Sequence, residues 1–158
     1  MKTQLEGSKA KYQIPSCIGA QCTQAQYSKW LYRRAVAHVK RDRKRNGQRS
    51  CSVADYKAQT HAAVIGGRNR DSYTGEALDW SLISRFRNDL AKKGGRKYKQ
   101  QFALLLTVDH ALDENGRQKF LICSWYVNDA KSDLTLEEFY ALCERALKHR
   151  DKLGREAS

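Results

Sequence analysis

The sequence predicts an α+β domain in which helices come first, a β-hairpin follows, and a last helix closes the chain. Apolar residues recur at helical spacing before residue 95, whereas two continuous apolar runs of strand length, 101–108 and 119–127, flank a turn with Asn115-Gly116 at its tip. Helical spacing returns after residue 134. This separation of helical and strand segments along the chain is typical of the α+β class.

At 158 residues, the chain has the length of one domain. Its N-terminal segment is polar and contains the single proline, Pro15, so we expect residues 1–22 to form a flexible arm. Residues 23–158 would then be one domain, with a helical part at 23–95 and a hairpin-helix part at 101–150.

The first helix should begin at the capping box of Thr23 and Gln26 and end at Asn46-Gly47. Its predicted buried face consists of Tyr27, Trp30, Leu31, Ala35 and Val39. From Lys29 to Arg49 this segment has nine basic residues and one acid, Asp42. Complementing the helix dipole would explain two or three of these charges, so we expect phosphate contacts here.

The later helices are delimited by the same kinds of signal. A second helix should be capped by Ser52 and end at Gly66-Gly67, and a third should span 79–95. The basic stretch 92–101 is expected to be either a backbone-tracking loop or a plain surface loop. A last helix should follow a capping box at Thr135. Its predicted buried face consists of Phe139, Leu142, Ala146 and Leu147.

The composition is strongly basic, with 30 Lys and Arg against 17 Asp and Glu and a formal net charge of +13. Such an excess repels itself unless a polyanion neutralises it, which favours nucleic acid as the partner over charge that serves solubility alone. The candidate nucleic-acid-binding residues are Arg33, Arg34, Lys40, Arg41, Arg43, Lys44, Arg45, Lys92, Lys93, Arg96, Lys97 and Lys99.

The five cysteines are an odd number and include no CxxC pair, so the spacing indicates neither a disulfide framework nor a structural zinc site. Cys17 and Cys22 are close enough in sequence to share a metal, but two ligands do not complete a tetrahedral site. No apolar stretch approaches the roughly 18 residues of a membrane span, and no export signal is evident. We therefore expect no membrane partner and a cytoplasmic location.

Polar residues lie at both ends of the predicted hairpin. Asp109 and His110 end the first strand, and Asn128 comes just after the second, so antiparallel pairing brings them to one rim. Neighbouring strand residues point to opposite faces, hence Asp109 and His110 converge only where the strand bends or ends. Carboxylate and amide oxygens suit Mg²⁺, Mn²⁺ or Ca²⁺, and an imidazole can act as a base.

These residues resemble the ββα-metal motif of the HNH, or His-Me finger, endonucleases. The segments "TVDH" and "NDAKSDLT" carry the resemblance, which covers residues 107–150. It implies a fold in which N-terminal helices pack on a C-terminal hairpin-helix motif. It also implies that His110 deprotonates water, that Asp109 and Asn128 hold one divalent cation, Mg²⁺ with Mn²⁺ as the alternative, and that Lys131 approaches the phosphate.

The chain departs from the family pattern in three respects. The middle Asn is absent, and Gln118, Lys119 or Asn115 would take its place. The proline that commonly follows Asp-His and the zinc-binding cysteines are also missing, although "YTGEAL" at 73–78 resembles the segment that precedes the motif. The expected function is metal-dependent hydrolysis of double-stranded DNA, and a homodimer is allowed. The alternative is a catalytically degenerate HNH-fold module that binds nucleic acid or regulates.

Overall fold

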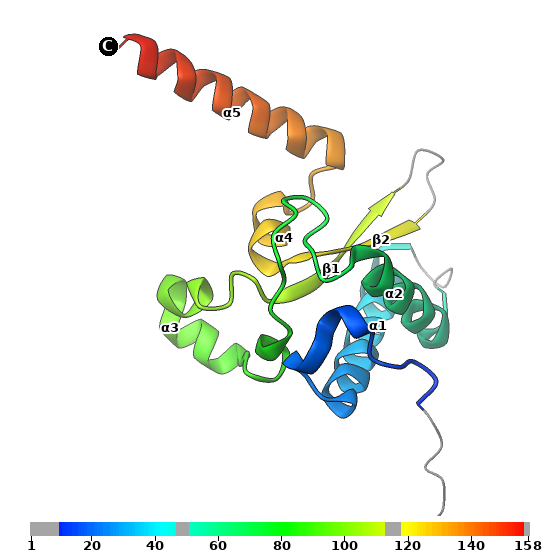
Figure 1. The fold of residues 1–158 in the computed structure, drawn as a ribbon. Coiled ribbons are helices and arrows are strands. Elements are labelled where there is room, and N and C mark those ends of the chain that lie inside the picture. The colour runs from blue at the N-terminus through cyan, green and yellow to red at the C-terminus, as the bar shows by residue number, and fades with distance from the viewer. Residues whose placement is uncertain (1–9, 47–50, 113–117, 157–158) are drawn as a thin grey trace, which may run out of the picture.

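The computed structural model describes residues 10–46, 51–112 and 118–156, and it has the α+β class that the sequence predicts. Figure 1 shows a largely helical molecule built around one small sheet. The elements in chain order are η1 (Ser16–Gln21), α1 (Gln24–Asn46), α2 (Val53–Gly67), η2 (Trp80–Ser84), α3 (Asn88–Gln100), β1 (Leu106–Leu112), β2 (Gln118–Ser124), α4 (Trp125–Lys131) and α5 (Leu136–Glu156).

The hairpin lies between two groups of helices. Strands β1 and β2 pair antiparallel, with Asp109 opposite Leu121 and His110 opposite Phe120. Helix α1 packs against α2, and α2 packs on β2, whereas α4 lies against both strands from another side (Figure 1). Each face of the hairpin therefore meets a different set of helices.

A continuous apolar core joins the N-terminal helices to the hairpin. Trp80 is fully buried, and its ring centroid lies 5.1 Å from that of Trp30 and 5.5 Å from that of Tyr27. From the hairpin, Leu106 and Ile122 enter the same cluster. Burying one large side chain of this kind contributes roughly 1.5–3 kcal/mol, so the hairpin is held on a rigid support.

The first helix agrees with the prediction in its bounds, its cap and its buried face. The capping box is formed, because Gln26 N donates to Thr23 Oγ1 at 3.2 Å and Thr23 N donates to Gln26 Oε1 at 2.8 Å. All five predicted core positions of α1 are buried.

The predicted caps of α2 and α5 are also confirmed. Ser52 N donates to Asp55 Oδ2 at 2.9 Å, and Asp55 N donates to Ser52 Oγ at 3.2 Å. At the start of α5, Thr135 N donates to Glu138 Oε2 at 2.8 Å.

The prediction of one helix over 79–95 is wrong. The 3-10 helix η2 ends at Ser84, and α3 spans Asn88–Gln100, so the predicted loop at 92–101 is largely helical. Leu82, which precedes the break, packs with Phe102 in a small second core. Within α3, Gly95 has a φ of 51° and bends the helix, a conformation that glycine adopts without strain.

The strand boundaries also differ from the prediction. Strand β1 begins at Leu106 rather than at residue 101 and continues past His110, so Asp109 and His110 lie inside the strand and not at its end. Strand β2 ends at Ser124, whose side chain accepts a hydrogen bond from Val127 N at 3.2 Å and caps α4. Trp125 and Tyr126, expected on the second strand, begin this helix. The predicted turn tip, 113–117, lies outside the described residues.

Two further expectations are corrected. The described part of the expected arm is packed against the domain, because Ile18 is buried and Gln21 Oε1 accepts a hydrogen bond from Trp80 N at 2.9 Å. Residues 1–9 lie outside the described residues. The predicted buried face of α5 is largely open, since Leu142 is 46% and Leu147 is 50% exposed. Within the described ranges, no helix is long and apolar enough to cross a membrane.

Candidate functional site

The hairpin directs Asp109 and His110 to opposite faces. Both lie in regular antiparallel pairing, in which neighbouring side chains alternate between faces. The expected convergence of the two residues at a bend or strand end is therefore not observed. Each residue instead belongs to its own polar cluster. The Asp109 cluster consists of Asp109, Tyr73 and Lys131, and the His110 cluster consists of His110, His38, Arg41, Asp42 and Tyr56.

In the Asp109 cluster, a buried carboxylate meets one cation and one hydroxyl. Lys131 Nζ lies 3.2 Å from Asp109 Oδ2, with side chains only 6% and 10% exposed. The Tyr73 hydroxyl donates a hydrogen bond to the same oxygen. Burial, followed by this hydrogen bond and the nearby negative charge, raises the pKa of Tyr73, so the tyrosine remains a donor across neutral pH.

A buried aspartate, Asp71, holds the loop that presents Tyr73. Asp71 Oδ1 accepts from Tyr73 N at 2.8 Å, while Oδ2 accepts from Ser124 N, the N-cap of α4, at 2.6 Å. The turn closes through Gly75, whose φ of 74° favours glycine. Asp71 thus ties the tyrosine loop to the junction of β2 and α4, and neither its role nor that of Tyr73 followed from the sequence.

Asn128 lies one helical turn before Lys131 on α4, so the two side chains share a helix face. Asn128 is half-buried, and Lys131 on this face contacts Asp109. The α4 face that meets Asp109 therefore includes both members of the predicted Asn-x-x-Lys pair, although Asn128 is inside a helix rather than just past a strand.

The ligand types at this place suit a hard divalent cation. Asp109 offers a carboxylate and Asn128 an amide oxygen, both typical ligands of Mg²⁺ and Mn²⁺. Across the part of the chain that the structure describes, no group of three or more His, Cys, Asp and Glu residues comes together as a metal site. A cation here would take its other ligands from water and phosphate, and it would share Asp109 with the Lys131 ammonium.

In the His110 cluster, one guanidinium bridges two imidazoles. Arg41 Nη2 lies 2.7 Å from His110 Nδ1 and 3.0 Å from His38 Nδ1. A guanidinium only donates, so both Nδ1 atoms accept, and each ring is then neutral with its proton on Nε2. The His110 ring also stacks on Phe120, with centroids 4.9 Å apart. His110 is therefore oriented by an aromatic ring and by Arg41.

Asp42 is a buried carboxylate beside His110. Its Oδ1 lies 3.6 Å from His110 Nδ1 and 3.6 Å from Arg41 Nε, and its Oδ2 accepts a hydrogen bond from the Tyr56 hydroxyl. Burial and Asp42 together raise the pKa of Tyr56. The sequence drew attention to Asp42 as the one acid in a basic run but gave no sign that it faces His110, which is 68 positions away along the chain.

His38 is kept neutral by its surroundings. Burial comes first, and the positive charge of Arg41 and the nearby His110 add to it, lowering the pKa of His38 from 6.5 to about 4. Arg34 also contributes, whereas Asp42 partly opposes the shift. His38 therefore acts as a neutral acceptor for Arg41 at physiological pH.

The predicted basic residues fall into two classes. Arg41 belongs to the His110 cluster, and Arg34 is half-buried with a pKa lowered by burial and by Arg33. The side chain of Arg45 lies outside the described residues. The exposed members are Arg33, Lys40, Arg43 and Lys44 on α1 and Lys92, Lys93, Arg96, Lys97 and Lys99 on α3.

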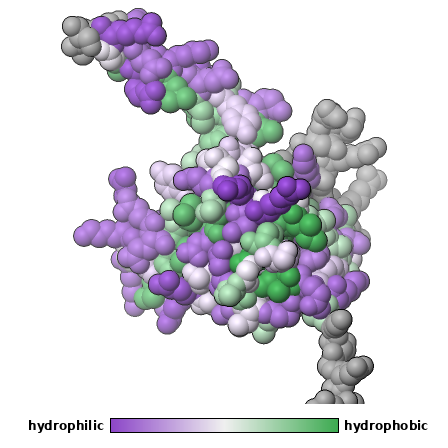
Figure 2. Space-filling view, in the orientation of Figure 1, coloured by the Kyte–Doolittle hydropathy of each residue, from purple (hydrophilic) through white to green (hydrophobic). Residues whose placement is uncertain are grey.

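The basic residues of α3 lie close to an aromatic side chain. Figure 2 shows hydrophilic side chains projecting from the α3 side of the molecule. Lys99 Nζ lies 5.2 Å from the centre of the Trp125 ring at the start of α4, and neighbouring Tyr126 is 63% exposed. Exposed cations next to an aromatic ring suit contact with a nucleic-acid backbone and its bases.

Comparisons with models of protein families, with curated proteins and with solved structures give no match to this chain.

Proposed function

We propose that the protein is a divalent-metal-dependent endonuclease of the HNH type that hydrolyses phosphodiester bonds in double-stranded DNA. One observation carries the proposal: a two-stranded hairpin followed by a packed helix has Asp109 on β1 in contact with the α4 face of Asn128 and Lys131. His110 is the next residue of the same strand, and Arg41 and Phe120 hold its ring.

On this proposal, Asp109 and Asn128 hold one divalent cation, Mg²⁺ or alternatively Mn²⁺. When bound, the cation neutralises charge on the scissile phosphate and the leaving 3′ oxygen. Lys131 lies 3.2 Å from Asp109 and can turn its ammonium from the carboxylate to a phosphate oxygen. The Tyr73 hydroxyl keeps Asp109 oriented during that exchange.

His110 would act as the general base, and Arg41 would control when it does so. In the arrangement described here, the Nδ1 lone pair accepts from Arg41, and Nε2 carries the proton. A substrate phosphate competes for the guanidinium, because arginine binds phosphate strongly. Once Arg41 is withdrawn, the neutral ring can change tautomer: Nδ1 takes up a proton that it donates to Asp42 Oδ1, now 3.6 Å away, while Nε2 releases its proton to solvent and becomes the base.

Exposed cations on α1 and α3 support a polyanionic substrate. The net charge of +13 and the row of lysines on α3 next to Trp125 suit phosphate contacts along a duplex. The choice of duplex DNA over RNA comes from the family resemblance.

Cleavage of supercoiled plasmid in Mg²⁺, Mn²⁺ or EDTA tests the proposal, with DNA binding measured in parallel by fluorescence anisotropy. The wild type should cut only with metal. His110→Ala should bind DNA as the wild type does yet cut about 10²- to 10⁴-fold more slowly, the range that a general base contributes. Absence of metal-dependent cutting by the folded wild type would contradict the proposal.

A second candidate is a catalytically degenerate HNH-fold module that binds DNA or regulates. It is favoured by the fact that His110 Nδ1 and Asp109 each already have a cationic partner, Arg41 and Lys131. For such a module, the wild type should bind DNA with no cutting in either metal, and His110→Ala should change nothing but stability.

A further inference from the structure

A surface pocket lies where the N-terminal segment runs beside α1 and α2 (Figure 1). It encloses a cavity of about 240 Å³. The residues that line it come from three separate parts of the chain and are Lys11, Tyr12, Tyr32, Val53, Ala54 and Lys57. None of them belongs to the Asp109 cluster or the His110 cluster, so the proposed nuclease chemistry gives this pocket no role.

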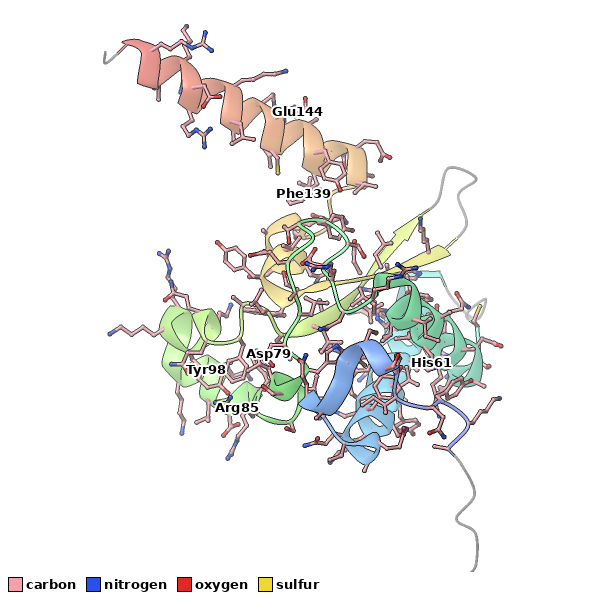
Figure 3. All side chains as sticks on the ribbon, viewed as in Figure 1. His61, Asp79, Arg85, Tyr98, Phe139 and Glu144 are labelled. Carbon is pink, nitrogen blue, oxygen red and sulfur yellow. The ribbon has the colours of Figure 1, made fainter. Side chains whose placement is uncertain are left out.

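Tyr12 forms part of the pocket wall and is anchored to both helices. Its carbonyl oxygen accepts a hydrogen bond from Gln24 Nε2 at 2.9 Å, and Ile14 N donates to Gln24 Oε1 at 2.8 Å. The Tyr12 ring packs on His61, with centroids 5.1 Å apart, and Figure 3 shows His61 between α2 and the N-terminal segment. His61 is itself fixed by a hydrogen bond of 2.6 Å between its Nδ1 and the Tyr27 hydroxyl. This wall is therefore preorganised.

Two ammonium groups converge on the Tyr12 ring. Lys57 Nζ lies 5.3 Å and Lys11 Nζ lies 5.5 Å from its centre. Such contacts hold an ammonium in place without neutralising its charge. Within the described residues, neither ammonium has a carboxylate oxygen within 4.0 Å, although Lys57 is half-buried. Two close cations without an acidic partner, one of them partly withdrawn from water, favour an anion as the occupant of the pocket.

The pocket also has an open aromatic ring. Tyr32 on α1 is 55% exposed, so part of its ring is available to a ligand, and Val53 adds apolar surface to the lining. Aromatic side chains stack on the flat face of a nucleobase, and ammonium groups bind phosphate oxygens. A pocket that combines the two suits a ligand with both a flat ring and a negative charge, which is the chemistry of a nucleotide.

We propose that this pocket binds one unpaired nucleotide, with its phosphate at Lys11 and Lys57 and its base against Tyr32. The source is either a free nucleotide or an unpaired nucleotide of a single strand. A base inside a duplex is already stacked on its neighbours, so a duplex does not fill the pocket and neither lysine contributes to duplex affinity. The proposal is independent of any nuclease activity, because it concerns binding by residues outside both clusters.

An NMR titration of the isotope-labelled chain with thymidine 5′-monophosphate measures the binding directly. The wild type should show saturable shifts, whereas thymidine and inorganic phosphate, which each lack half of the ligand, should bind about tenfold more weakly or worse. Lys57→Gln should weaken binding of the monophosphate by about tenfold to a hundredfold, because a charge-assisted contact is lost. Lys57→Arg, which keeps the charge, should retain most of the affinity. Lys148→Gln, which removes the same charge from exposed α5, is the matched control and should bind as the wild type does.

Substitutions of Tyr32 test the stacking half of the pocket. Tyr32→Ala should weaken binding of the monophosphate by about tenfold or more, whereas Tyr32→Phe should preserve it, because stacking does not need the hydroxyl. Circular dichroism checks that each variant is folded.

A short thymidine oligonucleotide distinguishes the two sources. If it binds about tenfold more tightly than the monophosphate and loses that affinity in Tyr32→Ala, the ligand is a single strand, and equal affinity identifies the free nucleotide. A folded wild type that binds neither probe would overturn the proposal. Binding that both Lys57→Gln and Tyr32→Ala leave unchanged would overturn it as well, since the nucleotide would then lie elsewhere on the protein.

Discussion

The two faces of the hairpin stabilise a buried charged group in different ways. On one face, Asp109 is neutralised by direct contact with Lys131, and Tyr73 adds a hydrogen bond. On the other face, His110 lies in a network in which Arg41 serves two imidazoles and Asp42, and the pKa of His38 is lowered to about 4. The Asp109 cluster thus depends on one ion pair, whereas the His110 cluster depends on several weaker contacts.

This difference has consequences for both stability and chemistry. A single buried ion pair is sensitive to loss of either partner, because the remaining charge is left without compensation. A shared network consists of several coupled hydrogen bonds, and its protonation responds to pH. If the protein is a nuclease, the Asp109 face provides ligands for a cation and the His110 face provides the base.

The largest stability effect should come from removing Asp109. Asp109→Ala leaves the Lys131 ammonium buried without its carboxylate, so we expect a loss of about 3–5 kcal/mol in the free energy of unfolding. Urea denaturation measures it. The double variant Asp109→Ala with Lys131→Met should recover much of that loss, and a double variant as unstable as the single one would show that the pair is not the cause.

The next effect is a pH dependence from the His110 face. Burial lowers the pKa of His38 from 6.5 to about 4, so between these values the unfolded chain binds a proton that the native protein does not. Stability should therefore fall by about 3 kcal/mol as the pH decreases from 6.5 to 4, and this contribution is fully present above 6.5. His38→Gln, which cannot titrate, should flatten that slope relative to the wild type in unfolding curves measured at each pH. An unchanged slope would contradict the buried neutral imidazole.

Two matched Tyr→Phe variants compare the faces directly. Tyr56→Phe removes the hydroxyl that donates to Asp42, a carboxylate that is 3% exposed, and should cost about 2 kcal/mol. Tyr73→Phe removes the donor to Asp109, which keeps Lys131, and should cost about 1 kcal/mol. Thermal unfolding measures both losses of stability. A larger loss for Tyr73→Phe than for Tyr56→Phe would contradict the difference between the two faces.

A smaller effect concerns the basic surface. If Lys92 and Lys97 on α3 each contact a phosphate, replacing both by Gln should reduce the slope of log affinity against log salt by about 0.9 per contact. Lys11→Gln, at an exposed site outside both basic segments, is the control and should leave the slope unchanged. Anisotropy titrations with a duplex at several salt concentrations provide the slopes. Equal slopes for all three proteins would exclude α3 from the DNA-binding surface.

Local signals in the sequence predicted much of the fold. The capping boxes at Thr23, Ser52 and Thr135 correctly located the starts of three helices, because each box involves residues only three positions apart. The periodic apolar positions of α1 were likewise sufficient to identify its buried face. The end of β2 was missed because an apolar run continues through Trp125, while the residue that caps α4 is a single serine supported by distant Asp71.

The site was only partly predictable for the same reason. Asp109, His110, Asn128 and Lys131 stand out because they occur in one short segment with a familiar spacing. The residues that hold them are far away in sequence, since Tyr73 contacts Asp109 and Arg41 contacts His110 only after the helices have packed. Asp109 and His110 point to opposite faces because β1 continues past them to Leu112, whereas the apolar run in the sequence ends at residue 108.

The most direct test of the central claim, that both faces of the hairpin serve one hydrolytic reaction, is plasmid cleavage in Mg²⁺ by one variant from each face. His110→Ala and Asn128→Ala should each lose about 10²-fold or more in cleavage rate while remaining folded, and His149→Ala on exposed α5 should cleave as the wild type does. If either His110→Ala or Asn128→Ala cuts at the wild-type rate, the corresponding face has no part in the reaction and the account is contradicted.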